Sequence, residues 1–357
     1  MPGDYYFSLC SREDDKKILS ILDSSPFGRD IKLVNSTRPS FFNAIEAFGE
    51  SNYVVGVRES STNNLIGFGS VNLQKRYFDG EIHSIGYMSH TRIKPEHRGK
   101  GITSKAFSYL KKNQDKFGAD FFITSIASDN KLALKIFTNK RKDYPYFFPL
   151  GEIFTKIIKL KKKKVPILQY NVSSLRDDHV TEVISFLNQA GKEKDLFPKY
   201  KSLKNEYLNI SDFVIVRKKD ELVGVCAIWD QRKFKQIIVK KYGGKLKIID
   251  KILRSFSLSY LPEVDKPLPL IYVSHLCIKG NNSDILHSMI NFIQNKDINP
   301  NTYMCFGIDV KDPLKIALKK YHGKSYKTKL FMISWDDLSA IAAESRKRVF
   351  YPEIALF

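Results

Sequence analysis

The residues with the clearest chemical signature in this chain are Arg98, Gly99, Lys100 and Gly101, within Arg92-Ile-Lys-Pro-Glu-His-Arg-Gly-Lys-Gly-Ile-Thr-Ser104. This stretch has the pattern of a strand end, a glycine-bearing loop and the start of a helix. Such an order gathers free backbone N–H groups and the positive end of a helix dipole at one point, where a phosphate binds well. The pattern therefore indicates a ligand that carries a phosphate or pyrophosphate.

Strands and helices are expected to alternate around this loop, because the apolar residues change between a period of two and helical spacing. Asp79-Gly80 is a hairpin signal that joins two strands antiparallel, and Gly118 is a suitable end for the helix after the loop. The elements expected before residue 161 are strands at 5–10, 53–58, 65–76, 81–93, 121–127 and 149–160, and helices at 14–22, 39–48, 102–117 and 131–140, the second opened by Pro39.

A run of lysines divides the chain. Lys161-Lys-Lys-Lys-Val-Pro166 combines charge with proline, which is typical of a boundary. The order of elements then repeats, so we expect a tandem duplication of one α+β unit, with domains at 1–164 and 165–338 and a tail at 339–357 that docks on the body. The elements expected in the second unit are strands at 167–172, 213–217, 222–230, 270–278, 304–310 and 326–335, and helices at 179–190, 285–293 and 313–320.

The loop and its flanking elements resemble the acyl-CoA-binding signature of the GNAT superfamily of N-acyltransferases. That signature is a strand ending in Val or Ile, then [Arg/Gln]-x-x-Gly-x-[Gly/Ala], then an amphipathic helix. Residues 98–102 match it and Thr103 departs at the last position. The resemblance covers residues 40–160. It implies an α+β fold of α/β/α layers with two tandem GNAT-like domains, each a mixed, mostly antiparallel sheet flanked by helices. The second is expected to be a degenerate copy, because it has no equivalent loop after Ile278.

The resemblance implies an acyl-CoA co-substrate, acetyl-CoA in the simplest case, and no metal. The amides of the loop would bind its pyrophosphate, and glycines would let the backbone approach closely because they lack Cβ. The strand before the loop would pair with the pantetheine arm and polarise the thioester carbonyl. The cofactor-binding residues implied are Thr91, Arg92, Ile93, Arg98, Gly99, Lys100, Gly101, Ile102, Thr103, Ser104 and Asn130.

Acyl transfer to an amine needs a base for the ammonium and an acid for the leaving thiolate. His90 is the titratable residue closest to the loop on the preceding strand, and its ordinary pKa of roughly 6.5 suits a base. The tyrosine that serves as acid in the family is replaced by Phe137, seven residues after Asn130. Tyr144 is the expected substitute, with Tyr146 and water as alternatives.

The composition limits the other function classes. The chain of 357 residues carries a net charge of +21, which suits nucleic acid, an anionic membrane or an anionic ligand. The lysines are spread along the chain, so an AT-biased genome explains them equally well and nucleic acid is the less favoured partner. With no membrane-length apolar run and four widely spaced cysteines, we expect a soluble, cytoplasmic protein.

The expected function is therefore transfer of an acetyl group from acetyl-CoA to a primary amine of a small molecule or peptide, by direct attack in a ternary complex. Two alternatives stay open. One is a Fem-like transferase that takes aminoacyl groups from tRNA, which the positive charge would suit. The other is a non-catalytic module that senses acyl-CoA, for which Phe137 leaves room.

Overall fold

The computed structural model describes residues 4–28, 31–138, 144–161, 169–244, 262–299, 301–351 and 353–357. Most of the boundary expected at 161–166 lies outside these residues. The elements before it are β1 (Tyr5–Leu9), α1 (Asp15–Asp23), β2 (Ile31–Ser36), α2 (Phe41–Glu46), β3 (Ser51–Glu59), β4 (Leu65–Phe78), β5 (Glu81–Ile93), α3 (Ile102–Lys112), α4 (Gln114–Phe117), β6 (Phe121–Ala127), α5 (Lys131–Thr138) and β7 (Tyr146–Lys159).

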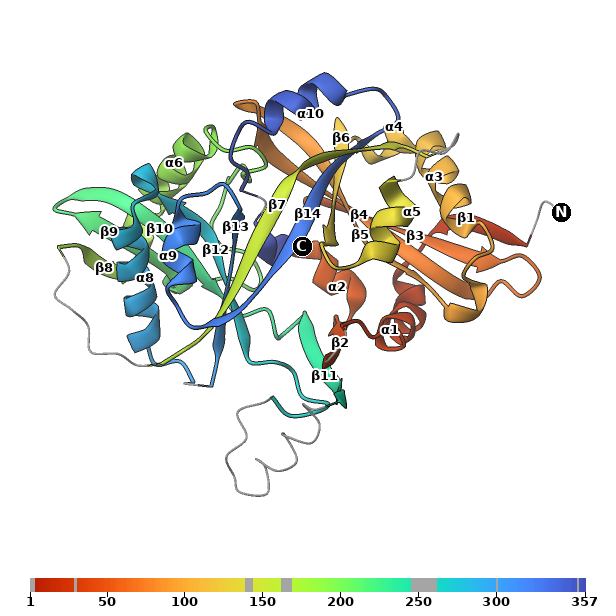
Figure 1. Cartoon of the computed structure of the whole chain (residues 1–357), viewed down its shortest axis with the longest axis horizontal. Helices are drawn as coiled ribbons and strands as arrows, with labels where there is room; N and C mark the ends of the chain where they lie inside the picture. The colour runs from red at the N-terminus through yellow and green to blue at the C-terminus, as the bar shows by residue number, and fades with distance from the viewer. Residues whose placement is uncertain are drawn as a thin grey trace.

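The elements after residue 168 repeat much of this order, and Figure 1 shows most of them on the left, with the elements of the first half on the right. They are β8 (Asn171–Ser174), α6 (Val180–Gly191), β9 (Phe213–Lys218), β10 (Glu221–Trp229), β11 (Gln236–Tyr242), β12 (Leu270–Ile278), α8 (Ser283–Asn295), β13 (Tyr303–Asp309), α9 (Leu314–Lys319), β14 (Gly323–Ser334) and α10 (Ser339–Ser345). Short 3-10 turns lie between several of them, including Pro95–His97 after β5 and Lys279–Asn281 after β12.

One twelve-stranded sheet runs through the molecule in the order β1-β3-β4-β5-β6-β14-β7-β13-β12-β10-β9-β8 (Figure 1). The sheet is mixed and mostly antiparallel, with parallel pairs β5–β6 and β12–β13. The expected α+β fold is therefore confirmed. The ribbon of β2 and β11 is separate and was not predicted from the sequence.

The two halves exchange strands at the middle of the sheet. β14 belongs to the second half, but it lies between β6 and β7 of the first. β7 in turn pairs with β13 on its other side. These strands are long, 14 residues for β7 and 12 for β14, so they pair with each other and with their outer neighbours at once. A buried apolar cluster that includes Ile153, Cys305 and Leu330 joins the halves here.

Helices cover the first half of the sheet on both faces. Ile18 of α1 and Phe41 of α2 pack in one apolar cluster with Phe68 of β4. On the other face, Leu110 of α3 packs with Phe117 of α4 in a separate cluster. Each helix therefore buries one apolar stripe against the sheet, as its spacing predicts.

Two helix details in the first half differ from the sequence prediction. The helix expected over 102–117 is broken at Asn113, whose backbone leaves the helical region at φ −115° and ψ 10°. The Asn113 side chain donates to the Tyr109 carbonyl at 2.8 Å, a local bond that competes with helix continuation. The helix expected to open at Pro39 begins at Phe41, because Ser40 caps it by accepting from the Asn43 amide.

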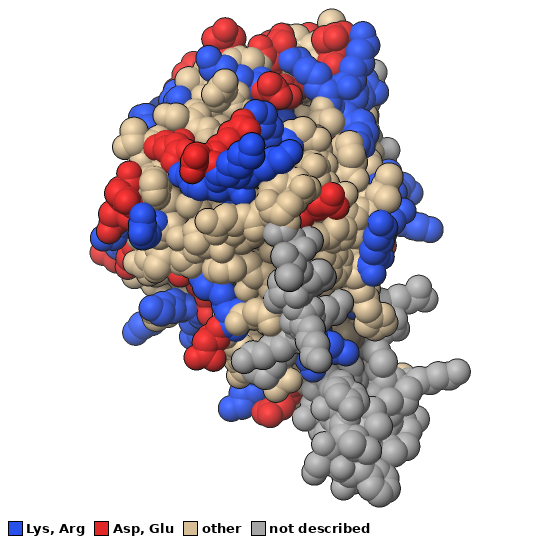
Figure 2. Space-filling model, turned by 90° about the vertical axis from the view of Figure 1, so that its left-hand side faces the viewer, with Lys and Arg blue, Asp and Glu red and all other residues tan. Residues whose placement is uncertain are grey.

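Charged side chains are mixed on the face of the second half. Figure 2 shows basic and acidic groups next to each other around a broad band of uncharged residues. Arg217 pairs with Glu182 and Lys279 with Glu221 on this half. The net positive charge is therefore not gathered into one basic surface on the described part of this face. No helix among the described residues has the length and apolar character needed to cross a bilayer.

Candidate functional site

The parallel strands β5 and β6 separate partway along their length. Their register pairs are Ile85 with Phe121, Gly86 with Phe122 and Tyr87 with Ile123. Beyond Tyr87 the strands are bridged by the Thr124 hydroxyl, which donates to the Met88 carbonyl at 2.9 Å. We call the space between them beyond Tyr87 the first gap. An extended ligand can bind in such a gap as an added strand.

A β-bulge lies on β5 beside the first gap. The β4–β5 register shifts between Phe68 and Ser70, so that His90 and Thr91 both lie opposite Gly69. His90 has a positive φ of 55°, which is uncommon for a residue other than glycine. The bulge keeps the His90 side chain on the same face of the sheet as Ser89, whose hydroxyl it contacts.

His90 is enclosed by hydroxyls and aromatic rings. Its Nδ1 lies 2.9 Å from both the Ser70 and Ser89 hydroxyls, and its ring packs edge-on against Phe41 with centroids 5.2 Å apart. The pKa of His90 is lowered to about 3, mainly by burial and secondly by the nearby positive charge of Arg92. The imidazole is therefore neutral at physiological pH, but it is a weak base. Its role as the catalytic base stays a prediction.

The predicted loop continues directly from the end of β5. Thr91, Arg92 and Ile93 are the last residues of the strand, and Arg98 Nε donates to the Ile93 carbonyl at 3.0 Å. Gly99 and Gly101 have φ of 78° and 71°, and a Cβ at either would meet no atom within 4 Å. These positions therefore need glycine for their left-handed backbone rather than for space.

The helix after the loop begins with an open N-terminus. Gly101 is the N-cap of α3 and has no side chain to cap it. The Lys105 amide bonds to the Gly101 carbonyl, so the amides of Ile102, Thr103 and Ser104 precede the first intrahelical bond. Ile102 is buried and anchors the helix on the sheet. Three amides and the positive helix end therefore point out from an anchored helix, next to the exposed Lys100.

The structure places Asn130 directly after β6, on the other side of the first gap. Its Oδ1 accepts from the Ala133 amide at 3.1 Å and so starts α5. Its side-chain NH₂ group is the part that could donate to a ligand. The role of Asn130 in binding pantetheine stays a prediction.

Tyr144 and Phe137 lie in one aromatic cluster around Phe107 of α3. Both contact Phe107, with ring centroids 5.0 Å and 6.1 Å away respectively. Phe137 also lies 5.8 Å from Phe147. Tyr144 therefore lies in the same group of rings as Phe137, the residue that replaces the tyrosine of the family. Its role as the acid stays a prediction.

The second half carries a matching bulge, and the sequence contains a signal for it that the prediction missed. Tyr87-Met-Ser-His-Thr-Arg-Ile-Lys94 and Tyr272-Val-Ser-His-Leu-Cys-Ile-Lys279 share Tyr, Ser, His, Ile and Lys at the same positions. His275 has a φ of 53°, and its Nδ1 lies 2.9 Å from the Ser274 hydroxyl, as in the first half. β12 also leaves its parallel partner β13 after Tyr272.

The second gap, between β12 and β13, differs because the chain itself fills it. The His275 amide donates to the Glu353 carboxylate at 2.6 Å, and the Leu276 amide donates to the Tyr351 hydroxyl at 2.6 Å. Ile354 packs so closely on Gly307 of β13 that a Cβ there would lie 2.2 Å from its side chain. Among the described residues, no side chain accepts from the amides of His90 or Thr91 in the first half.

The helix start in the second half is closed as well. The N-cap of α8 is Asn282, whose side chain accepts from the Asp284 amide at 2.8 Å. This bond satisfies an amide in the first turn of α8, whereas the glycine N-cap of α3 has no side chain that could do the same. The two halves therefore share a backbone plan, but in the part of the chain that the structure describes no side chain fills the gap or caps the helix of the first half, whereas side chains do both in the second.

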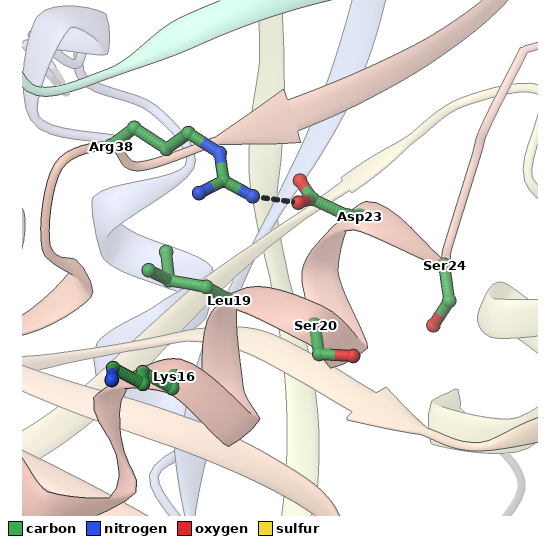
Figure 3. A pocket seen from close by; sticks show the side chains of 6 residues that line it. All are labelled: Lys16, Leu19, Ser20, Asp23, Ser24 and Arg38. Atoms are coloured by element: carbon green, nitrogen blue, oxygen red, sulfur yellow. Dashed lines mark hydrogen bonds and ion pairs between the residues drawn. The ribbon is translucent and has the colours of Figure 1, made fainter.

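Other hollows and clusters lie away from this arrangement. A surface hollow of about 430 Å³ lies on α1. Figure 3 shows the side chains that line it, among them Arg38 in an ion pair with Asp23. Lys16, Leu19, Ser20 and Ser24 also line this hollow, and none of its residues belongs to the predicted site. No group of three or more His, Cys, Asp or Glu side chains in the described part of the chain could hold a metal ion.

Comparisons with known proteins agree on the fold. No protein-family model matches the sequence, and no curated protein matches it. Among solved structures, a GCN5-related glucosamine N-acetyltransferase region of a fungal multi-domain GH3 β-N-acetylglucosaminidase superposes with a TM-score of 0.63 at 14% identity. That match covers 93% of this chain and 38% of the fungal chain, so this chain spans well under half of that protein.

Two further structures have the same architecture. N-myristoyltransferase from Saccharomyces cerevisiae with bound myristoyl-CoA superposes with a TM-score of 0.61 at 9% identity, covering 93% of this chain and 83% of the yeast chain. A GCN5-related N-acetyltransferase from Kribbella flavida gives a TM-score of 0.53 at 10% identity, covering 95% of this chain and 72% of that one. The chain therefore has the GNAT fold that these structures share.

Proposed function

We propose that the chain is an acyl-CoA-dependent N-acyltransferase that transfers an acetyl group from acetyl-CoA to a primary amine. The observation that carries this proposal is the contrast between the two halves. The first gap ends at an uncapped helix whose N-cap is Gly101, whereas the second is filled by Tyr351 and Glu353. An open gap beside an open helix end suits a ligand with an extended arm and a pyrophosphate.

In this proposal the pantetheine arm lies along the end of β5, and the pyrophosphate binds at the amides of residues 102–104. The residues present fit this ligand, because Gly99 and Gly101 hold the backbone in the left-handed region and the N-terminus of α3 has no side-chain cap. Lys100 and Arg98 add positive charge beside the phosphates. The four free cysteines suit a reducing compartment, and we propose a cytoplasmic location.

The chemistry proposed is direct attack. The acceptor nitrogen attacks the thioester carbonyl carbon, and backbone N–H groups at the bulge around His90 stabilise the negative oxygen. Collapse breaks the carbon–sulfur bond and releases the amide product. The thiolate takes a proton from Tyr144 or from water. Since His90 has a pKa of about 3, the amine loses its proton to His90 only weakly, and water shares this role.

A second candidate, a non-catalytic acyl-CoA sensor, is favoured by the weak basicity of His90 and by Phe137 in place of a tyrosine. Two measurements on the full chain separate the proposals. Acetyl-CoA at a hundred times its dissociation constant should raise the free energy of unfolding by about 2.7 kcal/mol. Release of free thiol with a library of amines then indicates an enzyme, whereas stabilisation without thiol release indicates a sensor. No stabilisation by any CoA thioester would contradict both.

A further inference from the structure

The inner end of the first gap is closed by two stacked aromatic rings. Tyr87 is the last residue of β5 that pairs with β6, and its hydroxyl lies 2.8 Å from the Ser125 hydroxyl across the strands. The ring of Phe357 stacks on the Tyr87 ring with centroids 4.3 Å apart and planes 14° from parallel. A residue from the other end of the chain therefore covers the point where the gap begins.

Phe357 is held in this place from several directions. Lys235 donates a hydrogen bond from its ammonium to the backbone oxygen of Phe357. The guanidinium of Arg76 lies 5.8 Å from the centroid of the Phe357 ring. The preceding residues are fixed in the second gap, where Glu353 accepts from the His275 amide and Gln231 donates to the Ala355 carbonyl at 2.6 Å. The ring is therefore a fixed wall rather than a loose end.

Other apolar side chains surround this wall, since Phe357 and Tyr87 belong to one cluster with Ile123 and Tyr272. Lys235 is half-buried, and burial lowers its pKa to about 8. Tyr272, which lies 5.4 Å from the Lys235 ammonium, contributes an aromatic ring to the same region.

The direction of the bound ligand decides which part of it meets the wall. With the pyrophosphate at the N-terminus of α3, the pantetheine arm runs inward along β5, and the acyl group points toward Tyr87. The opposite face of the sheet is filled by the helices α3 and α4, where Met88 packs with Phe117 and Phe122. The acyl group therefore ends against the stacked rings of Tyr87 and Phe357.

We propose that Phe357, stacked on Tyr87, limits the transferred acyl group to short chains by closing the inner end of the first gap. This inference rests on the proposed function. Replacing Phe357 with alanine leaves room beside the Tyr87 ring among apolar neighbours, and a longer acyl chain gains affinity by burying its methylene groups there. Phe357 is thus a specificity-determining residue contributed by the C-terminal segment.

The test is isothermal titration of the full chain with acetyl-, butyryl-, octanoyl- and myristoyl-CoA, for the wild type and the Phe357→Ala and Leu356→Ala variants. Leu356 is the matched control, because it is an equally half-buried neighbour that packs in a different cluster. We expect the wild type to bind octanoyl-CoA at least about tenfold more weakly than acetyl-CoA. Phe357→Ala should reverse this order, and Leu356→Ala should keep the wild-type order.

The outcomes separate this inference from the proposed function. Wild-type binding that is equally tight for all chain lengths overturns the role of Phe357 and leaves the acyl-CoA site intact. A Phe357→Ala variant that binds the series like the wild type overturns it as well. No binding of any CoA thioester overturns the proposed function together with this inference. If Phe357→Ala does not fold, the wild-type series and Phe357→Leu, which keeps the bulk and should keep the wild-type order, still decide the question.

Discussion

His90 and His275 occupy equivalent positions on the two bulged strands of this molecule. Their φ angles are 55° and 53°, and each Nδ1 lies 2.9 Å from the hydroxyl of the serine that precedes it. The amide of His275 is bonded to Glu353, whereas no described side chain accepts from the amide of His90. The same local structure therefore faces a filled gap in one half and an open gap in the other.

The first prediction concerns the glycine loop. Gly101→Glu should abolish stabilisation by acetyl-CoA, because it places bulk and negative charge where the pyrophosphate binds. Gly118→Glu is a matched control, since Gly118 also has a positive φ, 64°, and a Cβ there would meet no atom within 4 Å. Both variants should lose about 1–2 kcal/mol of folding stability through the left-handed backbone. Thermal unfolding with and without acetyl-CoA measures both effects, and equal losses of binding would contradict the site.

The second prediction concerns the catalytic acid. Tyr144→Phe should lower kcat by about a hundredfold and leave the KM for acetyl-CoA unchanged, because only the proton donor is removed. Tyr146→Phe should have little effect, since Tyr146 is 42% exposed and stacks on Phe148 instead. Steady-state thiol release with both variants checks this. A kcat unchanged in Tyr144→Phe assigns the proton to water.

The third prediction concerns pH. The folded pKa of His90 and of His275 is about 3 in each case, below the unfolded value of roughly 6.5. The unfolded chain therefore binds more protons between these values, so the free energy of unfolding is fully present above pH 6.5 and falls as the pH drops toward 3. The loss should be about 2 kcal/mol per histidine at pH 5.

Denaturant unfolding at pH 7.5 and pH 5 measures this loss, and His275→Asn should reduce it. An unchanged pH dependence in that variant would show that His275 does not carry its share. In solution NMR, neither imidazole should titrate between pH 5 and 8.

The fourth prediction concerns the seat of the C-terminal segment. Gly307→Ala should destabilise the protein by about 1–3 kcal/mol, because the new Cβ would lie 2.2 Å from the Ile354 side chain. In the double variant with Ile354→Ala this overlap is relieved, so the double variant should be more stable than the sum of the two single losses predicts. Additive losses would mean that Ile354 does not lie on Gly307.

The sequence predicted the parts of the fold that local patterns determine. The hairpin at Asp79-Gly80, with φ of 55° and 76°, and the helix end at Gly118 follow from backbone preferences of single residues. The insertion of β14 between β6 and β7 depends on pairing between strands about 200 residues apart, for which no local pattern exists. The ribbon of β2 and β11 was missed for the same reason.

The site was predictable to the same extent. The loop at residues 98–104 has a compact motif, because one turn and one helix start must provide all its amides. The wall is formed by Phe357 stacked on Tyr87 and held by Lys235, and only the folded chain brings these three distant residues together. The repeated Tyr-x-Ser-His-x-x-Ile-Lys was visible in the sequence, and an internal comparison of the halves would have located both bulges.

The central claim is that the first half binds acyl-CoA and that the chain itself fills the equivalent place in the second. Isothermal titration of the full chain with acetyl-CoA tests this claim directly through its stoichiometry. We predict one molecule bound per chain, lost in Gly101→Glu and retained in Gly118→Glu. A stoichiometry of two, or binding that survives Gly101→Glu, would contradict the claim.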